Sequence, residues 1–235
     1  MGIPRYVALL LPPTILLAGC ATTAHSDRSY TPPDPVTIKN ETQLNDSFDA
    51  VWDRLVGRLA TGFFVINNID KSSRIINVSY STDTPVKFVD CGRSVRTFAA
   101  NGENKRYAYN VAESSVYQWG GNWGPLNNLP RVAVVQRSTS LEGRINIYVA
   151  PAAKTTKVSV NTKYILRIST RGVATSYNAF GGVVSQTAIP PDSVDIGFTT
   201  AEPGGKTFED LTNPQTISCE ANGTLEQELL AKAAP

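Results

Sequence analysis

A strict two-residue alternation over residues 157–170 constrains the fold of this chain more than any other feature. Successive side chains of a β-strand point to opposite faces of its sheet, so the pattern predicts a long strand with one buried and one solvated face. One wet face is typical of antiparallel sheets. The residues expected to face the core are Val158, Val160, Thr162, Tyr164, Leu166 and Ile168.

Other segments have strand character as well. Residues 63–69 and 74–80 flank the turn-forming sequence Asp70-Lys71-Ser72-Ser73, which predicts a β-hairpin. Residues 131–139 and 144–150 are expected to form two strands joined by a turn at residues 140–143, and residues 215–220 a last strand.

Two helices are expected beside these strands. Apolar residues recur at helical spacing over residues 48–59, and Gly62 follows as a C-terminal stop signal. A second, short helix is expected over residues 225–232. The predicted fold class is therefore α+β: an amphipathic helix packed on a mostly antiparallel sheet, a β-rich C-terminal half and a short C-terminal helix.

The first 20 residues resemble a bacterial lipoprotein signal peptide. Arg5 precedes an apolar run from Tyr6 to Leu17, and Ala18-Gly19-Cys20 ends it. The run is too short for a permanent membrane span, which needs about 20 apolar residues. The resemblance implies that residues 1–19 are removed and that Cys20 becomes a lipidated, acylated N-terminus. An ordinary secretory signal is the alternative.

The same resemblance implies a location. Ala21, in place of Asp, favours the outer membrane of a Gram-negative bacterium, with the protein facing the periplasm and surface display as the alternative. Residues 20–36 are small, polar and rich in proline, so we expect a flexible tether that reaches up to roughly 50 Å. Residues 37–235 are expected to form one periplasmic domain, with a subdivision near residues 82–130 left open.

Once Cys20 is lipidated, Cys91 and Cys219 remain. An oxidising periplasm favours a disulfide between them, while two separate buried thiols are the alternative. The only histidine is His25, in the expected tether, so no metal site and no cofactor are predicted. The formal net charge is +2 without a basic cluster, so no nucleic-acid partner is expected.

Aromatic residues gather between residues 105 and 130, among glycines and asparagines. Tyr117, Trp119 and Trp123 are candidate contacts for a protein partner or a glycan, because aromatic rings provide large rigid surfaces. The alternative is that the tyrosines of this segment alternate on strands and face the core while Trp119 and Trp123 cover its end.

Residues 48–81 resemble the helix-grip repeats of the BamC (NlpB/DapX) family through a helix with a central Trp52, a glycine turn and the hairpin FFVINNIDKSSRIINVSYS. The family consists of lipid-anchored accessory subunits of the outer-membrane β-barrel assembly machinery, so the resemblance implies a similar role.

The sequence lacks the familiar catalytic signatures. It has no phosphate-binding glycine loop, no dinucleotide fingerprint and no nucleophile elbow. We therefore expect a non-catalytic outer-membrane lipoprotein, held on the membrane by its lipid, that serves as an accessory or scaffold subunit of an envelope complex such as barrel-assembly, secretion or conjugation machinery. The alternative is a lipoprotein that binds peptidoglycan or another carbohydrate through residues 105–130.

Overall fold

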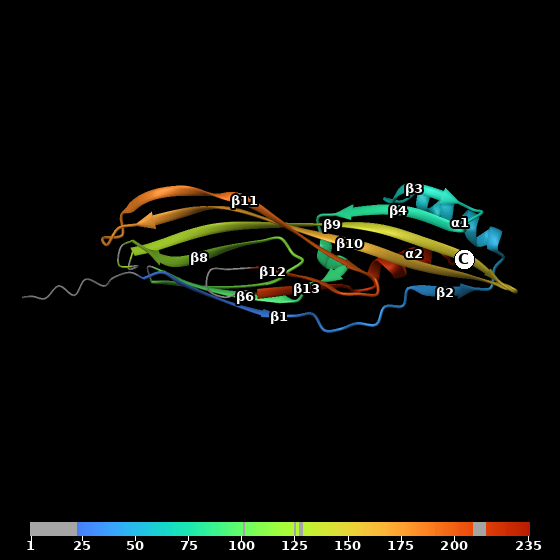
Figure 1. Cartoon of the computed structure of the whole chain (residues 1–235), viewed down its shortest axis with the longest axis horizontal. Helices are drawn as coiled ribbons and strands as arrows, with labels where there is room; N and C mark the ends of the chain where they lie inside the picture. Colours follow the sequence, from blue (N-terminus) through green and yellow to red (C-terminus); the bar gives the residue numbers. More distant parts are fainter. Residues whose placement is uncertain (1–22, 101, 125, 127–128, 209–214) are drawn as a thin grey trace, which may run out of the picture.

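A long two-stranded ribbon runs through the molecule (Figure 1). The computed structural model describes residues 23–100, 102–124, 126, 129–208 and 215–235. The ribbon consists of β9 (Leu129–Ala152) and β10 (Thr155–Tyr177), which pair antiparallel from Ala152 and Thr155 to Arg131 and Ser176. At about 3.3 Å per residue, β9 reaches up to roughly 80 Å, which accounts for the elongated shape.

The ribbon is the centre of a seven-stranded sheet. Its order is β11 (Val183–Thr199), β10, β9, β4 (Ile75–Thr82) and β3 (Val65–Asp70), with β2 (Glu41–Leu44) pairing to β10 and β8 (Ser115–Trp123) to β9. The six residues of β10 predicted to face the core are all buried. Together with α1 (Phe48–Ala60) and α2 (Thr224–Ala233), this sheet confirms the predicted fold class.

Two smaller sheets complete the fold. One contains β1 (His25–Thr31), β6 (Arg93–Ala100) and β7 (Glu103–Asn110), and the other β12 (Gly204–Phe208), β13 (Gln215–Ala221) and β5 (Val89–Asp90). A short 3-10 helix, Pro85–Lys87, precedes β5.

The prediction of a flexible tether over residues 20–36 is wrong for His25–Thr31. This segment is β1, paired antiparallel with β6 along its whole length. The Tyr30 hydroxyl donates to the carbonyl of Ser218 and accepts from the Ser218 amide, at 3.1 and 2.9 Å. Backbone pairing does not depend on apolar side chains, which is why the polar composition of β1 concealed it.

The turn predicted at residues 140–143 is also wrong, because β9 continues through it. Leu141 is buried in the core. Gly143 pairs with Tyr80 of β4 and Tyr164 of β10, so the ladder is unbroken at this glycine. The predicted hairpin of β3 and β4 is confirmed.

The helix α1 begins and ends close to the predicted positions. Ser47 is its N-cap, and its hydroxyl accepts a hydrogen bond from the amide of Ala50. The C-cap is Thr61, one residue before Gly62. Its apolar face, which contains Val51, Trp52, Leu55 and Leu59, is buried.

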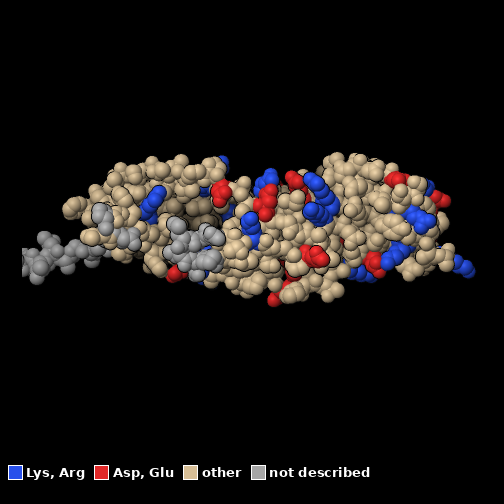
Figure 2. All heavy atoms as spheres, viewed as in Figure 1, with Lys and Arg blue, Asp and Glu red and all other residues tan. Residues whose placement is uncertain are grey.

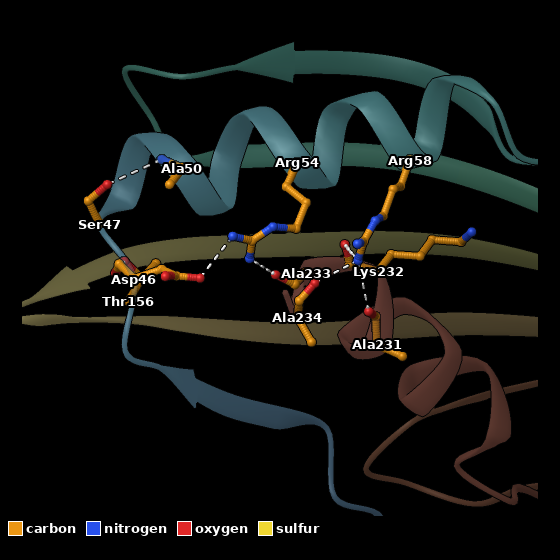
Figure 3. Close-up of polar contacts among 10 residues, drawn as sticks. All are labelled: Asp46, Ser47, Ala50, Arg54, Arg58, Thr156, Ala231, Lys232, Ala233 and Ala234. Atoms are coloured by element: carbon orange, nitrogen blue, oxygen red, sulfur yellow. Dashed lines mark hydrogen bonds and ion pairs between the residues drawn. The ribbon is translucent and has the colours of Figure 1, made fainter.

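Two arginines of α1 bind the C-terminal end of α2 (Figure 3). Arg54 donates to the carbonyl of Ala233 at 2.7 Å and to the carboxylate of Asp46 at 2.9 Å. Arg58 donates to the carbonyls of Ala231, Lys232 and Ala234. The last carbonyls of a helix lack partners within the helix and carry partial negative charge, so these guanidinium groups stabilise the docking of α2.

Replacing Arg54 with alanine is expected to lower the free energy of unfolding by about 1–2 kcal/mol, because a half-buried ion pair and a charge-assisted hydrogen bond are lost. Lys71→Ala is the matched control. Lys71 bridges Asp49 and Asp53 at exposed positions of the same helix, and such pairs contribute little. Urea unfolding of both variants checks the difference, and equal losses would contradict it.

A buried polar cluster joins α2 to the sheet. The carboxyl Oε1 of Glu226 accepts hydrogen bonds from the hydroxyls of Tyr164 and Thr200, each at 2.7 Å, and both Glu226 and Tyr164 are fully buried. Burial, together with the neighbouring Glu226 carboxylate, raises the pKa of Tyr164 well above its ordinary value of 10.0.

The raised pKa of Tyr164 predicts alkaline sensitivity. In the unfolded chain this tyrosine loses its proton near pH 10, while in the folded protein it keeps it, so stability falls as the pH rises above 10. The free energy of unfolding, measured at several pH values from 8 upward, should fall less steeply for Tyr164→Phe than for the wild type. Identical slopes would contradict this assignment.

Candidate binding surfaces

The two cysteines of the folded part form a disulfide. Cys91, between β5 and β6, is bonded to Cys219 in β13, and both are fully buried. Beside it, Asp90 Oδ1 accepts from the Gly92 amide and from the Asn110 side chain. The predicted disulfide is therefore present, and it links β13 to the segment between β5 and β6 inside the core. Cys20 lies outside the described residues.

Tyr117 lines a partly open pocket where the three sheets meet. Its ring stacks on that of Tyr109, with centroids 6.1 Å apart, and the Arg96 guanidinium lies 4.2 Å from its centroid. Arg96 also donates to the Tyr109 hydroxyl at 2.8 Å. Tyr117 is only 8% exposed, so the prediction that it contacts a partner or a glycan is replaced by a packing role.

This arginine–tyrosine pocket, lined by Arg28, Arg96, Tyr109, Tyr117 and Arg137 among others, encloses about 150 Å³. Burial lowers the pKa of Arg137 and raises that of Tyr117. The described lining contains no carboxylate, so its chemistry suits a small anion. Arg137, however, already donates to the backbone carbonyls of Val111 and Glu113, which fixes the loop before β8.

The two tryptophans of β8 differ in exposure. Trp119 is 42% exposed, and its ring lies over Gly121, where an added Cβ would come within 2.9 Å of it. Trp123 is half-buried, and its indole nitrogen donates to the carbonyl of Tyr177 at 3.3 Å. The three predicted aromatic contacts therefore share no single exposed platform, and Trp119 is the most accessible of them.

One end of the molecule carries few charges; those it has include Arg131 of β9, which pairs with Gly121 and Ser176, and Lys105, which donates to Gln118 of β8. Residues 114–130 and 172–191 contain no Asp, Glu, Lys or Arg, and the pairing of β8, β9, β10 and β11 brings the two segments together. In Figure 2 the charged side chains lie mostly over the middle and right of the molecule, away from this end. We call it the uncharged end. Its exposed apolar side chains include Trp119, Leu126, Val173, Phe180, Val183 and Val184.

The sheet carries a row of amides nearer its other end. Asn67, Asn77, Asn146 and Asn161 come from the neighbouring strands β3, β4, β9 and β10, and we call them the asparagine row. Asn67 donates to Asn77 at 3.0 Å, and Asn77 donates to Asn146 at 2.6 Å. Asn146 stands opposite Asn161 in the ladder. The row lies on the face opposite the buried side chains and offers donors and acceptors to a partner.

Within the part of the chain that the structure describes, no group of three or more His, Cys, Asp or Glu side chains is placed to hold a metal ion. Neither α1 nor α2, the helices of the described residues, has the length and apolar character needed to cross a bilayer. Comparisons with protein-family models, curated proteins and solved structures found no match.

Sequence reasoning missed the uncharged end and the asparagine row. The absence of charge over residues 114–130 and 172–191 is visible in the sequence, but only the strand pairing shows that the two segments are neighbours. The asparagines are likewise visible one by one, while their row depends on the register of four strands.

Proposed function

We propose that this chain is a non-catalytic outer-membrane lipoprotein that serves as an accessory or scaffold subunit of an envelope complex, of the barrel-assembly, secretion or conjugation kind. The observation that carries the proposal is the position of the lipoprotein-like Leu17-Ala18-Gly19-Cys20 sequence, which ends five residues before β1. A lipid on Cys20 would thus be joined almost directly to a rigid sheet.

Reach would then come from the length of the ribbon. Asn146 lies 17 residues along β9 from Leu129, which corresponds to about 55 Å. The asparagine row would be presented to a partner at that distance from the uncharged end. The edge strand β3, which exposes Val65, offers a second contact through strand addition.

The anchor is tested by the mass of the mature protein isolated from membranes. We expect a lipid-modified Cys20 as the N-terminal residue. Several acyl chains make anchoring effectively permanent, and Cys20→Ser cannot carry them, so we expect this variant to leave the membrane fraction. Wild-type protein with an unmodified Cys20 would contradict the proposal.

The partner is tested by site-specific photo-crosslinking in cells. A crosslinker at Asn146 is expected to capture a barrel-assembly or secretion protein in stoichiometric amount, whereas one at Lys206, an exposed residue of β12, should not. Equal capture at both positions would argue against a docking role for the asparagine row.

Peptidoglycan binding is the alternative function, and the exposure of Trp119 is the observation that favours it. Sedimentation with purified sacculi, lost on Trp119→Ala, would support it. Sedimentation unchanged by this substitution would remove Trp119 as the glycan contact.

A further inference from the structure

The turn between β10 and β11 exposes an apolar tip at the uncharged end. Phe180 is 97% exposed, and Val183 and Val184 follow it on β11. Contiguous exposed apolar side chains on a protein surface indicate an interaction site with an apolar partner.

The backbone of this turn is already hydrogen-bonded. Asn178 Oδ1 accepts from the amides of Phe180 and Gly182, at 3.0 and 2.8 Å. The Asn178 amide donates to the carbonyl of Gly182, and the Gly181 amide donates to the carbonyl of Asn178. Moving unpaired backbone groups into an apolar medium is strongly unfavourable, so a turn whose backbone groups are already paired loses less on leaving water.

The N-terminal side of β1 starts at this same end. The Ala24 amide donates to the Asn122 side chain at 2.9 Å. Trp123, which follows Asn122, donates a hydrogen bond from its indole nitrogen to the carbonyl of Tyr177 at the end of β10. Cys20 precedes Ala24 by four residues, a reach of about 14 Å when extended. A lipid on Cys20 would therefore hold the uncharged end close to the membrane surface.

We infer that the uncharged end is a bilayer-contact surface, with the Phe180 tip inserted among the headgroups and upper acyl chains. This inference rests on the proposed function for the lipid on Cys20. Interfacial segments bury their apolar side chains about 5–10 Å into this region, and tryptophan rings favour it. Because the lipid makes the second contact intramolecular, a weak apolar contact suffices. The ribbon then points away from the bilayer.

The test uses the full lipidated chain in vesicles of phosphatidylethanolamine and phosphatidylglycerol. An environment-sensitive dye is attached at Ala179→Cys, next to Phe180, or at Ser81→Cys as the matched control. Both positions are exposed, and Ser81 pairs with Glu142, about 40 Å along β9 from Leu129. We expect the emission at position 179 alone to shift to the blue and to be quenched by lipids brominated on their acyl chains.

A second measurement uses the unlipidated Cys20→Ser protein and the same vesicles. Phe180→Asp is expected to weaken vesicle binding roughly tenfold, since burial of a phenylalanine side chain is lost. Phe63→Asp, which changes a residue that is 93% exposed outside the uncharged end, should leave binding unchanged.

The outcomes separate the two proposals. If the protein is lipidated but the dye at position 179 shows the same emission and quenching as the dye at position 81, the bilayer contact is overturned and the anchor stands. Dye insertion with an unmodified Cys20 in native protein supports the contact and contradicts the anchor. A blue shift that depends on protein concentration and is not quenched by brominated lipid indicates a second copy of the chain and overturns the inference.

Discussion

Replacing Cys91 and Cys219 together with alanine is expected to lower the free energy of unfolding by about 2–5 kcal/mol. The bond joins residues 128 positions apart, so its loss frees a long loop in the unfolded chain. In the folded chain, β13 pairs with β5 through only two residue pairs, Glu220 with Asp90 and Ala221 with Val89. The disulfide therefore supports a short contact that holds one small sheet in place.

The measurement is urea unfolding followed by circular dichroism, with Cys20→Ser protein as the reference so that no free cysteine interferes. Adding a reductant to the reference should reproduce the loss, while the variant that also lacks Cys91 and Cys219 should not respond to reductant. Stability that is equal with and without the disulfide would show that the core alone holds β13.

Elements with local periodic patterns could be predicted from the sequence. The apolar positions of α1 and the alternation in β10 each predict one buried face, and in each element the predicted face is buried. The hairpin of β3 and β4 was predictable because a polar turn separates two strand-like segments. In each case the pattern depends on residues that are close in sequence.

Elements fixed by distant partners could not be predicted. β1 is polar, and its pairing with β6 spans more than 60 residues, so composition indicated a tether. Gly143 indicated a turn inside β9, although the strand continues through it, paired with Tyr80 and Tyr164. The predicted disulfide followed from the compartment and the number of cysteines. The burial of Tyr117 depended on Tyr109 and Arg96, which no local pattern connects to it.

Replacing Glu226 with alanine is expected to lower the free energy of unfolding by about 3–5 kcal/mol, as large an effect as loss of the disulfide. The substitution leaves a cavity beneath α2 and removes the acceptor of two buried hydroxyls, those of Tyr164 and Thr200. Glu226→Gln is the matched control. It keeps one oxygen as acceptor and nearly the same volume, so a smaller loss of about 1 kcal/mol is expected.

A double-mutant cycle tests whether the loss comes from this polar cluster or from packing alone. Tyr164→Phe by itself should cost about 1–3 kcal/mol, because the buried carboxyl of Glu226 loses a donor. Added to Glu226→Ala, the same substitution should cost less, because it then removes a hydroxyl that already lacks its partner. Strictly additive losses would mean that the Tyr164 hydroxyl and the Glu226 carboxyl stabilise α2 independently, and the cluster would then act through packing rather than through its hydrogen bonds.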